Sequence, residues 1–170
     1  MLEVVRLGLI RAVSFNCDHI ALEALNRVGL RGYEGRFFQE LSGGEQQRVQ
    51  LARVLVQVWQ PVGSDGPRWL FLDEPVSSLD IGHQLQIMQV ARDFAHAGGG
   101  VIAVTHDLNL ASMFADRVTL VSDGNVACCG SPGDVFSDKT LSKAYDCQIS
   151  VSTMPSRGPF ILPQSAALSV

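Results

Sequence analysis

The sequence predicts an α/β fold in which short apolar strands alternate with amphipathic helices around a largely parallel sheet. Three apolar runs, at residues 69–72, 101–105 and 118–122, have the length of buried strands. Between the first two runs, Leu85, Met88, Ala91 and Phe94 recur at helical spacing. The chain has 170 residues, of which 46% are hydrophobic and 18% charged, so it is long enough for one domain with a sizeable core.

Helix and turn signals predict the remaining elements. We expect helices at residues 1–15, 18–30, 42–59, 80–97 and 108–115, and small helices at 132–136 and 141–145. Ser42 and Glu45 have capping-box spacing at the start of the third helix, and Gly29 or Gly32 ends the second. Residues 31–40 indicate a loop and residues 60–68 a cluster of turns. Asp123-Gly124 predicts a hairpin into residues 125–128, and a further strand is expected at 148–152 before a proline-rich end.

Composition argues against several classes of function. The chain has 13 Lys and Arg against 17 Asp and Glu, and its net charge of −4 disfavours non-specific nucleic-acid binding. No apolar run approaches the ~18 residues of a membrane span, and charged residues interrupt residues 1–15, which therefore do not have the apolar core of a secretory signal. The four cysteines are Cys17, Cys128, Cys129 and Cys147. None lies in a CxxC pair, so we expect reduced thiols in a cytosolic protein and no metal site built on them.

Two carboxylates follow the strand expected at residues 69–72. Parallel strands present their carboxyl ends at the edge of the sheet where α/β proteins bind ligands, so Asp73 and Glu74 are expected at that edge. Asp73 can hold Mg²⁺ through water, because Mg²⁺ prefers oxygen ligands and keeps part of its hydration shell. Glu74 can act as a general base that polarises a water for attack on a phosphoryl group. The alternative is a strand end followed by a solvated acidic turn.

A pair of glycines opens the helix expected at residues 42–59. Gly43 and Gly44 let a phosphate approach the backbone closely, and the helix N-terminus supplies free N–H groups and the positive end of the helix dipole. Ser42 and Glu45 fit a phosphate contact, but they also fit ordinary capping of a helix. This motif alone does not decide between the two.

Two more polar motifs accompany the same predicted sheet edge. His106 ends the second strand, where it can contact a γ-phosphate or position the attacking water. The alternative is a histidine whose neighbour, Asp107, caps the following helix. Ser78 and Asp80 come directly after the acidic pair, and Asp80 is also the expected N-cap of the helix at residues 80–97.

In this order and spacing, the motifs LSGGE (41–45), LFLDEP (70–75), SSLD (77–80) and VTHD (104–107) resemble those of the ATP-binding subunits of ABC transporters. The string LSGGEQQRVQLARVL is similar to the signature motif and signature helix of that family, and the resemblance extends over residues 18–163. It implies an α/β, three-layer, P-loop NTPase-like core. Residues 1–40 would be a remnant of the helical subdomain, residues 41–130 the ATPase core, and residues 131–170 a C-terminal extension of the same domain.

The resemblance also implies a role for each motif in a head-to-tail dimer that sandwiches two ATP molecules. The signature residues would bind the nucleotide held by the partner subunit, and they are Ser42, Gly43, Gly44 and Glu45. Asp73 would serve Mg²⁺ through water, Glu74 would be the catalytic base, and His106 would sense the γ-phosphate. Ser78 and Asp80 would form the D-loop, which communicates across the dimer.

The phosphate loop of that family, GxxxxGK[ST], does not occur in these 170 residues. The only lysines are Lys139 and Lys143, preceded by Asp138 and Ser142, so neither fits the loop. The resemblance therefore implies that the N-terminal strands are missing too, with apolar surface exposed in their place. Phosphoryl transfer depends on that loop to position the phosphates and to neutralise their charge. We therefore expect this chain alone not to hydrolyse ATP. A catalytically inactive fragment that binds a partner is the alternative.

The C-terminal part narrows the kind of transporter. Residues 130–136, 140–145, 148–151 and 158–163 are similar to the ends of importers for iron chelates, cobalamin and haem. The insertion at residues 62–67 and the closing PFILPQ look most like the haemin-import branch. The resemblance implies an ATPase on the cytoplasmic side of the bacterial inner membrane, bound to a permease and served by a periplasmic haem-binding protein. Ferric-siderophore or cobalamin import remains open, as does a DNA-repair or translation ATPase, although those usually have long insertions or a duplicated cassette.

Overall fold

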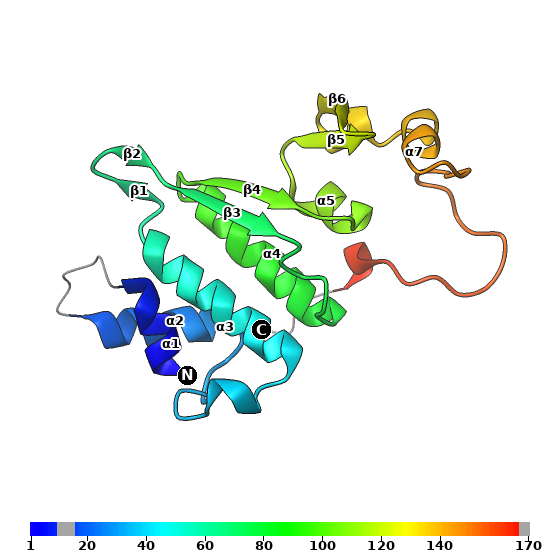
Figure 1. Cartoon of the computed structure of the whole chain (residues 1–170). Helices are drawn as coiled ribbons and strands as arrows, with labels where there is room; N and C mark the ends of the chain where they lie inside the picture. Colours follow the sequence, from blue (N-terminus) through cyan, green and yellow to red (C-terminus); the bar gives the residue numbers. More distant parts are fainter. Residues whose placement is uncertain (10–15, 167–170) are drawn as a thin grey trace. The chain divides into compact units, whose positions relative to one another are not determined.

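The computed structural model describes residues 1–9 and 16–166. These residues form two compact units, of which the first ends at His106 and the second begins at Asp107 (Figure 1). The first unit contains α1 (Leu2–Arg6), η1 (Leu7–Leu9), α2 (Cys17–Arg27), η2 (Phe38–Glu40), α3 (Gly43–Leu55), η3 (Val56–Val58), β1 (Val62–Gly63), β2 (Gly66–Pro67), β3 (Trp69–Asp73), α4 (Ile81–His96) and β4 (Gly100–Val104). The second unit contains α5 (Leu108–Phe114), β5 (Val118–Ser122), β6 (Asn125–Gly130), α6 (Pro132–Val135), α7 (Asp138–Ala144) and η4 (Pro163–Ser165).

A parallel pair of strands forms the sheet that carries the acidic motif. β3 pairs with β4 in a register that sets Phe71 opposite Ile102. Because side chains alternate along a strand, Leu70 and Leu72 are buried, whereas Trp69 and Phe71 lie on the other face and are exposed. α4 packs against β4 (Figure 1). The sheet therefore has an exposed apolar face, as the family resemblance implied. The expectation that residues 69–72 and 101–105 form buried strands was wrong, because Phe71, Ile102 and Val104 are exposed.

The helices of the first unit pack together beside this sheet. α1, α2 and α3 contact one another. α2 ends where Gly29 takes a positive φ of 72°, and the Leu30 N–H donates to the Leu25 carbonyl at 2.9 Å, the 6→1 bond of a Schellman motif. The buried guanidinium of Arg48, on α3, donates to the carbonyls of Val28 and Gly29, each at 3.3 Å. The C-terminus of α2 is thus tied directly to the helix that begins with the LSGGE motif.

Most of the expected elements are confirmed in the first unit. The helix expected at residues 42–59 is α3 followed by η3, and the helix expected at residues 80–97 is α4 with Asp80 as its N-cap. α1 and η1 cover the start of the helix expected at residues 1–15, of which residues 10–15 lie outside the described residues. The cluster of turns predicted at 60–68 contains a small antiparallel hairpin, β1–β2, which the turn signals alone did not indicate.

The second unit contains the predicted hairpin. Asp123 and Gly124 have φ values of 51° and 73°, the positive values that a two-residue hairpin loop requires, and they join β5 to β6. α6 and α7 confirm the two small helices, and Ser131 forms a capping box at the start of α6.

Two further expectations about strands were wrong. Instead of one largely parallel sheet, the strands of the described residues form three two-stranded sheets, and only β3–β4 is parallel. Residues 148–152 form no strand, because side chains of α7 take their backbone hydrogen bonds. The Ile149 N–H donates to the Ser142 hydroxyl at 2.9 Å, and the Val151 N–H donates to the Asp138 carboxylate at 2.8 Å.

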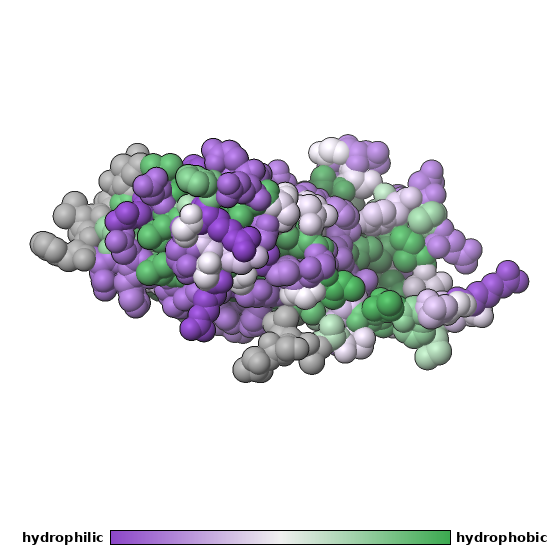
Figure 2. All heavy atoms as spheres, turned by 90° about the horizontal axis from the view of Figure 1, so that it is seen from below, coloured by the Kyte–Doolittle hydropathy of each residue, from purple (hydrophilic) through white to green (hydrophobic). Residues whose placement is uncertain are grey.

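The four cysteines are free thiols, half-buried at Cys17 and Cys128 and exposed at Cys129 and Cys147. Figure 2 shows polar and apolar residues interspersed on the face seen there. In the described part of the chain, no helix is both long and apolar enough to cross a membrane.

Candidate functional site

The acidic motif lies where the parallel sheet ends. The Glu74 N–H donates to the Val104 carbonyl at 3.0 Å and so extends the β3–β4 ladder by one residue. Glu74 itself has a φ of 46°, in the left-handed region that a glutamate rarely adopts, so the chain turns sharply directly after the strand. Asp73 remains exposed at the carboxyl end of β3. The sheet edge therefore carries both carboxylates, as the sequence predicted.

The side chains of Glu74 and His106 meet. Nδ1 of His106 lies 2.9 Å from Oε1 and 2.8 Å from Oε2 of Glu74. An ionised carboxylate only accepts hydrogen bonds, so a hydrogen bond to it requires the tautomer with the proton on Nδ1. His106 is 74% exposed and Glu74 37% exposed, and Glu74 Oε2 is shielded from solvent. The pair thus combines a held carboxylate with an imidazole that faces solvent.

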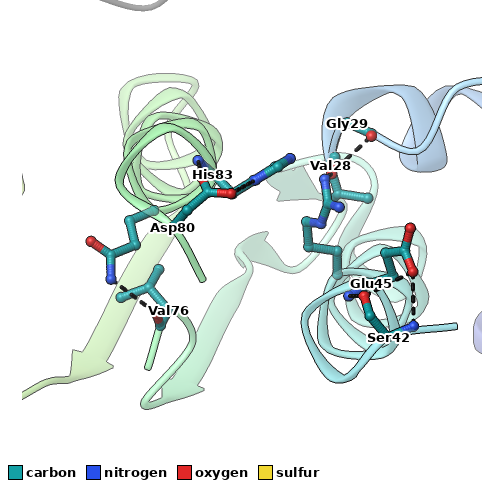
Figure 3. Close-up of polar contacts among 9 residues, drawn as sticks. Val28, Gly29, Ser42, Glu45, Val76, Asp80 and His83 are labelled. Carbon is teal, nitrogen blue, oxygen red and sulfur yellow. Dashed lines mark hydrogen bonds and ion pairs between the residues drawn. The ribbon is translucent and has the colours of Figure 1, made fainter. Parts of the chain in front are cut away.

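The start of α3 is closed by a capping box. The N–H and hydroxyl of Ser42 both donate to the Glu45 carboxylate at 2.8 Å, and the Glu45 N–H donates to the Ser42 hydroxyl at 3.4 Å (Figure 3). The Ser42 N–H and hydroxyl hold the pKa of Glu45 below its usual value. In this structure Ser42 and Glu45 are thus engaged with each other, as in the capping interpretation of the motif.

The two glycines of the motif lie in different surroundings. A Cβ at Gly43 would meet no atom within 4 Å, so the backbone there is open to an approaching group. A Cβ at Gly44 would lie 3.1 Å from the Leu79 side chain and 3.4 Å from the Ser78 carbonyl oxygen. Gly43 therefore leaves space for a ligand, whereas Gly44 lets α3 approach the segment that follows the acidic motif.

Gln47 joins α3 to the acidic motif, and sequence analysis missed it. Its Nε2 donates to the Glu74 carbonyl at 3.0 Å, and its Oε1 accepts a hydrogen bond from the Ser78 hydroxyl. The sequence did contain a signal for this residue. Gln47 lies three residues after Gly44 and therefore on the same helix face as the glycine pair. The structure thus links the LSGGE helix, Glu74 and Ser78 through one side chain.

Asp80 caps α4 and pairs with His83, a residue that the sequence did not single out. The His83 N–H donates to Asp80 Oδ1 at 3.0 Å, and Nδ1 of His83 lies 2.8 Å from Oδ2 (Figure 3). The backbone N–H of His83, followed by its side chain, lowers the pKa of the Asp80 carboxyl from its usual 3.8. The anionic form of Asp80 is therefore the one that the fold favours.

This lowered pKa predicts how stability depends on pH. Asp80 stabilises the fold above its unfolded pKa of 3.8, and this contribution is lost as the pH falls through the lower folded pKa. Asn is an equally good N-cap that does not titrate. The quantity to follow is the difference in the free energy of unfolding between the wild type and Asp80→Asn. We expect this difference to decrease as the pH is lowered below 3.8. Urea denaturation at a series of pH values measures it, and a constant difference would contradict the role assigned to Asp80.

Comparison with known proteins finds relatives along almost the whole chain. A sequence profile described as ABC transporter matches residues 8–77. The hemin import ATP-binding protein HmuV of Jannaschia sp. (strain CCS1) is 60% identical over 167 residues, which cover 98% of this chain and 62% of the relative. The protein of the same description from Mesorhizobium japonicum is 57% identical over 169 residues, covering 96% of this chain and 64% of the relative. Almost the whole of this chain is thus similar to ABC transporter ATP-binding proteins. The chain spans a little under two thirds of the length of these ABC relatives.

Solved structures of ABC ATPases confirm the fold class. An ATP-binding cassette solved as a dimer with ADP and Pi is 33% identical, with a TM-score of 0.65 over 77% of this chain and 56% of that one. The protein cbiO1 from Clostridium perfringens, described as part of an ABC transporter complex, is 27% identical, with a TM-score of 0.63 over 82% of this chain and 53% of that one. The α/β, P-loop NTPase-like core predicted from the sequence is thus confirmed.

Proposed function

We propose that this chain is part of the ATP-hydrolysing subunit of an importer for haem. The main support for ATP hydrolysis is the Glu74–His106 pair at the carboxyl edge of the β3–β4 sheet. The relatives described as hemin import ATP-binding proteins, 53–60% identical to this chain, support haem as the cargo. No residue named here would touch haem, because in such a system the permease and the binding protein select it.

The proposed chemistry assigns one task to each group at the sheet edge. Glu74 polarises the water that attacks the γ-phosphate of ATP, as a positioned general base does. His106, whose Nδ1 contacts the Glu74 carboxylate, would present its other ring nitrogen to the γ-phosphate. It can donate to both partners only as the imidazolium, which has an N–H on each ring nitrogen, so His106 would act in that form. Charge spreads over the equatorial oxygens of the transferred group, so a donor placed there stabilises the transition state.

The start of α3 would serve a nucleotide held by a second subunit. Gly43, which has open space around it, lets a phosphate reach the N–H groups of the first turn. Ser42 would turn its hydroxyl from Glu45 to the phosphate, since a hydroxyl rotates to suit its partner. Glu45 would remain as the cap that keeps the first turn in place. Ser78 and Asp80 lie in the adjoining segment and would form the D-loop contact between subunits.

Asp73 fits the magnesium ion that accompanies ATP in this proposal. In the part of the chain that the structure describes, no three His, Cys, Asp or Glu side chains cluster as a metal site. Mg²⁺ does not need such a cluster, because it keeps several waters and binds through one or two carboxylates together with substrate phosphates. The exposed carboxylate of Asp73 at the end of β3 suits this mode of binding. The ion would neutralise phosphate charge.

The proposed assembly is a head-to-tail pair of ATPase subunits on a permease, at the cytoplasmic face of the inner membrane, with a periplasmic haem-binding protein on the other side. A cassette of related sequence solved as a dimer supports the pairing of ATPase subunits. Co-purification from membranes tests the assembly. We expect the chain to be recovered with an integral-membrane permease, whereas recovery with nucleic acid or ribosomes would contradict it.

Growth on haem tests the cargo. A strain deleted for the gene, with haem as its sole iron source, should regain growth when the gene is restored at its own locus. The matched control is the same strain supplied with a ferric siderophore, on which the deletion should have little effect. Rescue on the siderophore without rescue on haem would overturn the haem assignment. A restored gene that carries Glu74→Gln should fail on haem, because the general base is missing.

A further inference from the structure

We propose that Gln47 is a positioning residue that couples the signature helix α3 to the Glu74 carboxylate of the same chain. The inference rests on the proposed function and adds how the site is regulated. A nucleotide bound at the start of α3 would influence, through Gln47, the geometry of the base that serves the other nucleotide. Gln47 does not touch the substrate in this scheme but acts through the backbone of Glu74.

The contacts of Gln47 use both ends of its amide. Nε2 donates to the Glu74 carbonyl at 3.0 Å, and Oε1 accepts from the Ser78 hydroxyl. The same Glu74 carbonyl also accepts from the Ser77 hydroxyl at 3.2 Å and from the Ser77 N–H at 3.4 Å. Of the donors to this carbonyl, Gln47 is the one that comes from a distant element of the chain. The orientation of the peptide after Glu74 is therefore set partly by α3.

The backbone of Glu74 makes this peptide sensitive to its support. A non-glycine residue at a φ of 46° is in a sparsely populated conformation that persists only where its surroundings enforce it. If the donor from Gln47 is lost, the peptide can relax toward a commoner conformation, and the side chain of Glu74 rotates with it. The contact between the carboxylate and His106 Nδ1, at 2.8–2.9 Å, would then be displaced.

The packing of α3 explains how a displacement at the start of the helix can change the position of Glu74. Gly44 lies against Leu79 and the Ser78 carbonyl, and Gln47 lies one turn further along the same helix face. A shift of α3 when phosphate binds at Gly43 thus moves Gly44 and Gln47 together. Because the helix and the segment 77–79 are packed in direct contact, such a shift is transmitted to Glu74 through bonded and packed atoms.

Epistasis with Glu74 separates positioning from a merely structural role. In the protein produced from its own locus, Gln47→Met removes both polar contacts at nearly constant side-chain volume. We expect the single-turnover rate of ATP hydrolysis to fall by about 10- to 10²-fold, as a small misplacement of a catalytic group does, with KM for ATP almost unchanged. In a Glu74→Gln background the same substitution should not lower the rate further, because the carboxylate that Gln47 positions is already absent.

The matched control is Gln50→Met, on the exposed side of the same helix, where the Gln50 side chain accepts a hydrogen bond from the neighbouring Arg53. It should hydrolyse ATP at the wild-type rate. If Gln47→Met lowers turnover by the same factor with and without Glu74, its effect is structural and the proposal is wrong. Wild-type turnover in Gln47→Met would overturn it equally.

Amide hydrogen exchange tests the coupling without any need for hydrolysis. In the 170-residue chain, Gln47→Met should speed exchange of the Ser77 and Leu79 amides, which donate to the carbonyls of Glu74 and Val76. Gln50→Met should leave both amides unchanged. Unchanged exchange in Gln47→Met would overturn the proposal whatever the turnover shows. If instead the wild type shows no hydrolysis that depends on Glu74, the proposed function fails, and the exchange data still decide whether Gln47 supports Glu74.

Discussion

Replacing Glu74 with Gln is expected to lower the rate of ATP hydrolysis by about 10²–10⁴-fold, the usual contribution of a general base. The amide has nearly the shape of the carboxylate, so the backbone turn and the contact with His106 can be retained. What is lost is the ability to polarise the attacking water. ATP binding should therefore stay close to the wild-type value. Phosphate release under saturating ATP, and nucleotide binding measured separately, check the two halves of the prediction in the protein produced from its own locus.

The control for this substitution is Glu3→Gln, the same chemical change at an exposed position of α1. It should alter neither turnover nor nucleotide binding. A Glu74→Gln protein that hydrolyses ATP within a few-fold of the wild type would show that another group serves as the base. A Glu74→Gln protein that no longer binds ATP would show that Glu74 acts in binding, and the role assigned to it here would be wrong.

Introducing a methyl group at Gly8 is expected to destabilise the fold by about 1–3 kcal/mol, as overpacking of a tight contact does. A Cβ at this position would overlap the carbonyl oxygen of Arg53 and would lie 2.5 Å from Cγ2 of Val56. The carbonyl belongs to α3 and cannot move aside as a flexible side chain can. η1 must therefore shift away from α3. Urea denaturation of the Gly8→Ala chain measures the loss in the free energy of unfolding.

Gly35→Ala is the matched control, because a Cβ at Gly35 would meet no atom within 4 Å. A surface change of this kind usually alters the free energy of unfolding by no more than about 0.5 kcal/mol. Equal stabilities of the two variants would contradict the close packing of η1 on α3.

The sequence predicted best those parts of the molecule that local chemistry decides. Ser42 with Glu45, and Asp123 with Gly124, determine a helix start and a hairpin loop through contacts within four residues, and both predictions are confirmed. The placement of Asp73, Glu74 and His106 at one edge followed from the strand pattern together with the family resemblance. The structure adds that Glu74 and His106 are in direct contact, which no spacing in the sequence contains.

The features that the sequence did not reveal depend on partners distant in the chain. Gln47 is an ordinary helix residue until its contacts with Glu74 and Ser78 are seen, 27 and 31 residues away. The segment at residues 148–152 has the composition of a strand, but Ser142 supplies the hydrogen bonds that another strand would otherwise provide to Ile149. In both cases a side chain replaces a backbone partner, and hydrophobic periodicity contains no information about such a replacement.

The left-handed backbone at Glu74 opposes the stability of the fold to the catalytic role proposed for this residue. A glutamate held at a φ of 46° costs about 1–3 kcal/mol of strain, whereas a glycine adopts the same conformation without steric cost. The fold alone would therefore be served better by glycine. A search for thermostable variants of this protein would select against Glu74 for that reason, and any such screen needs a measure of turnover beside the melting temperature.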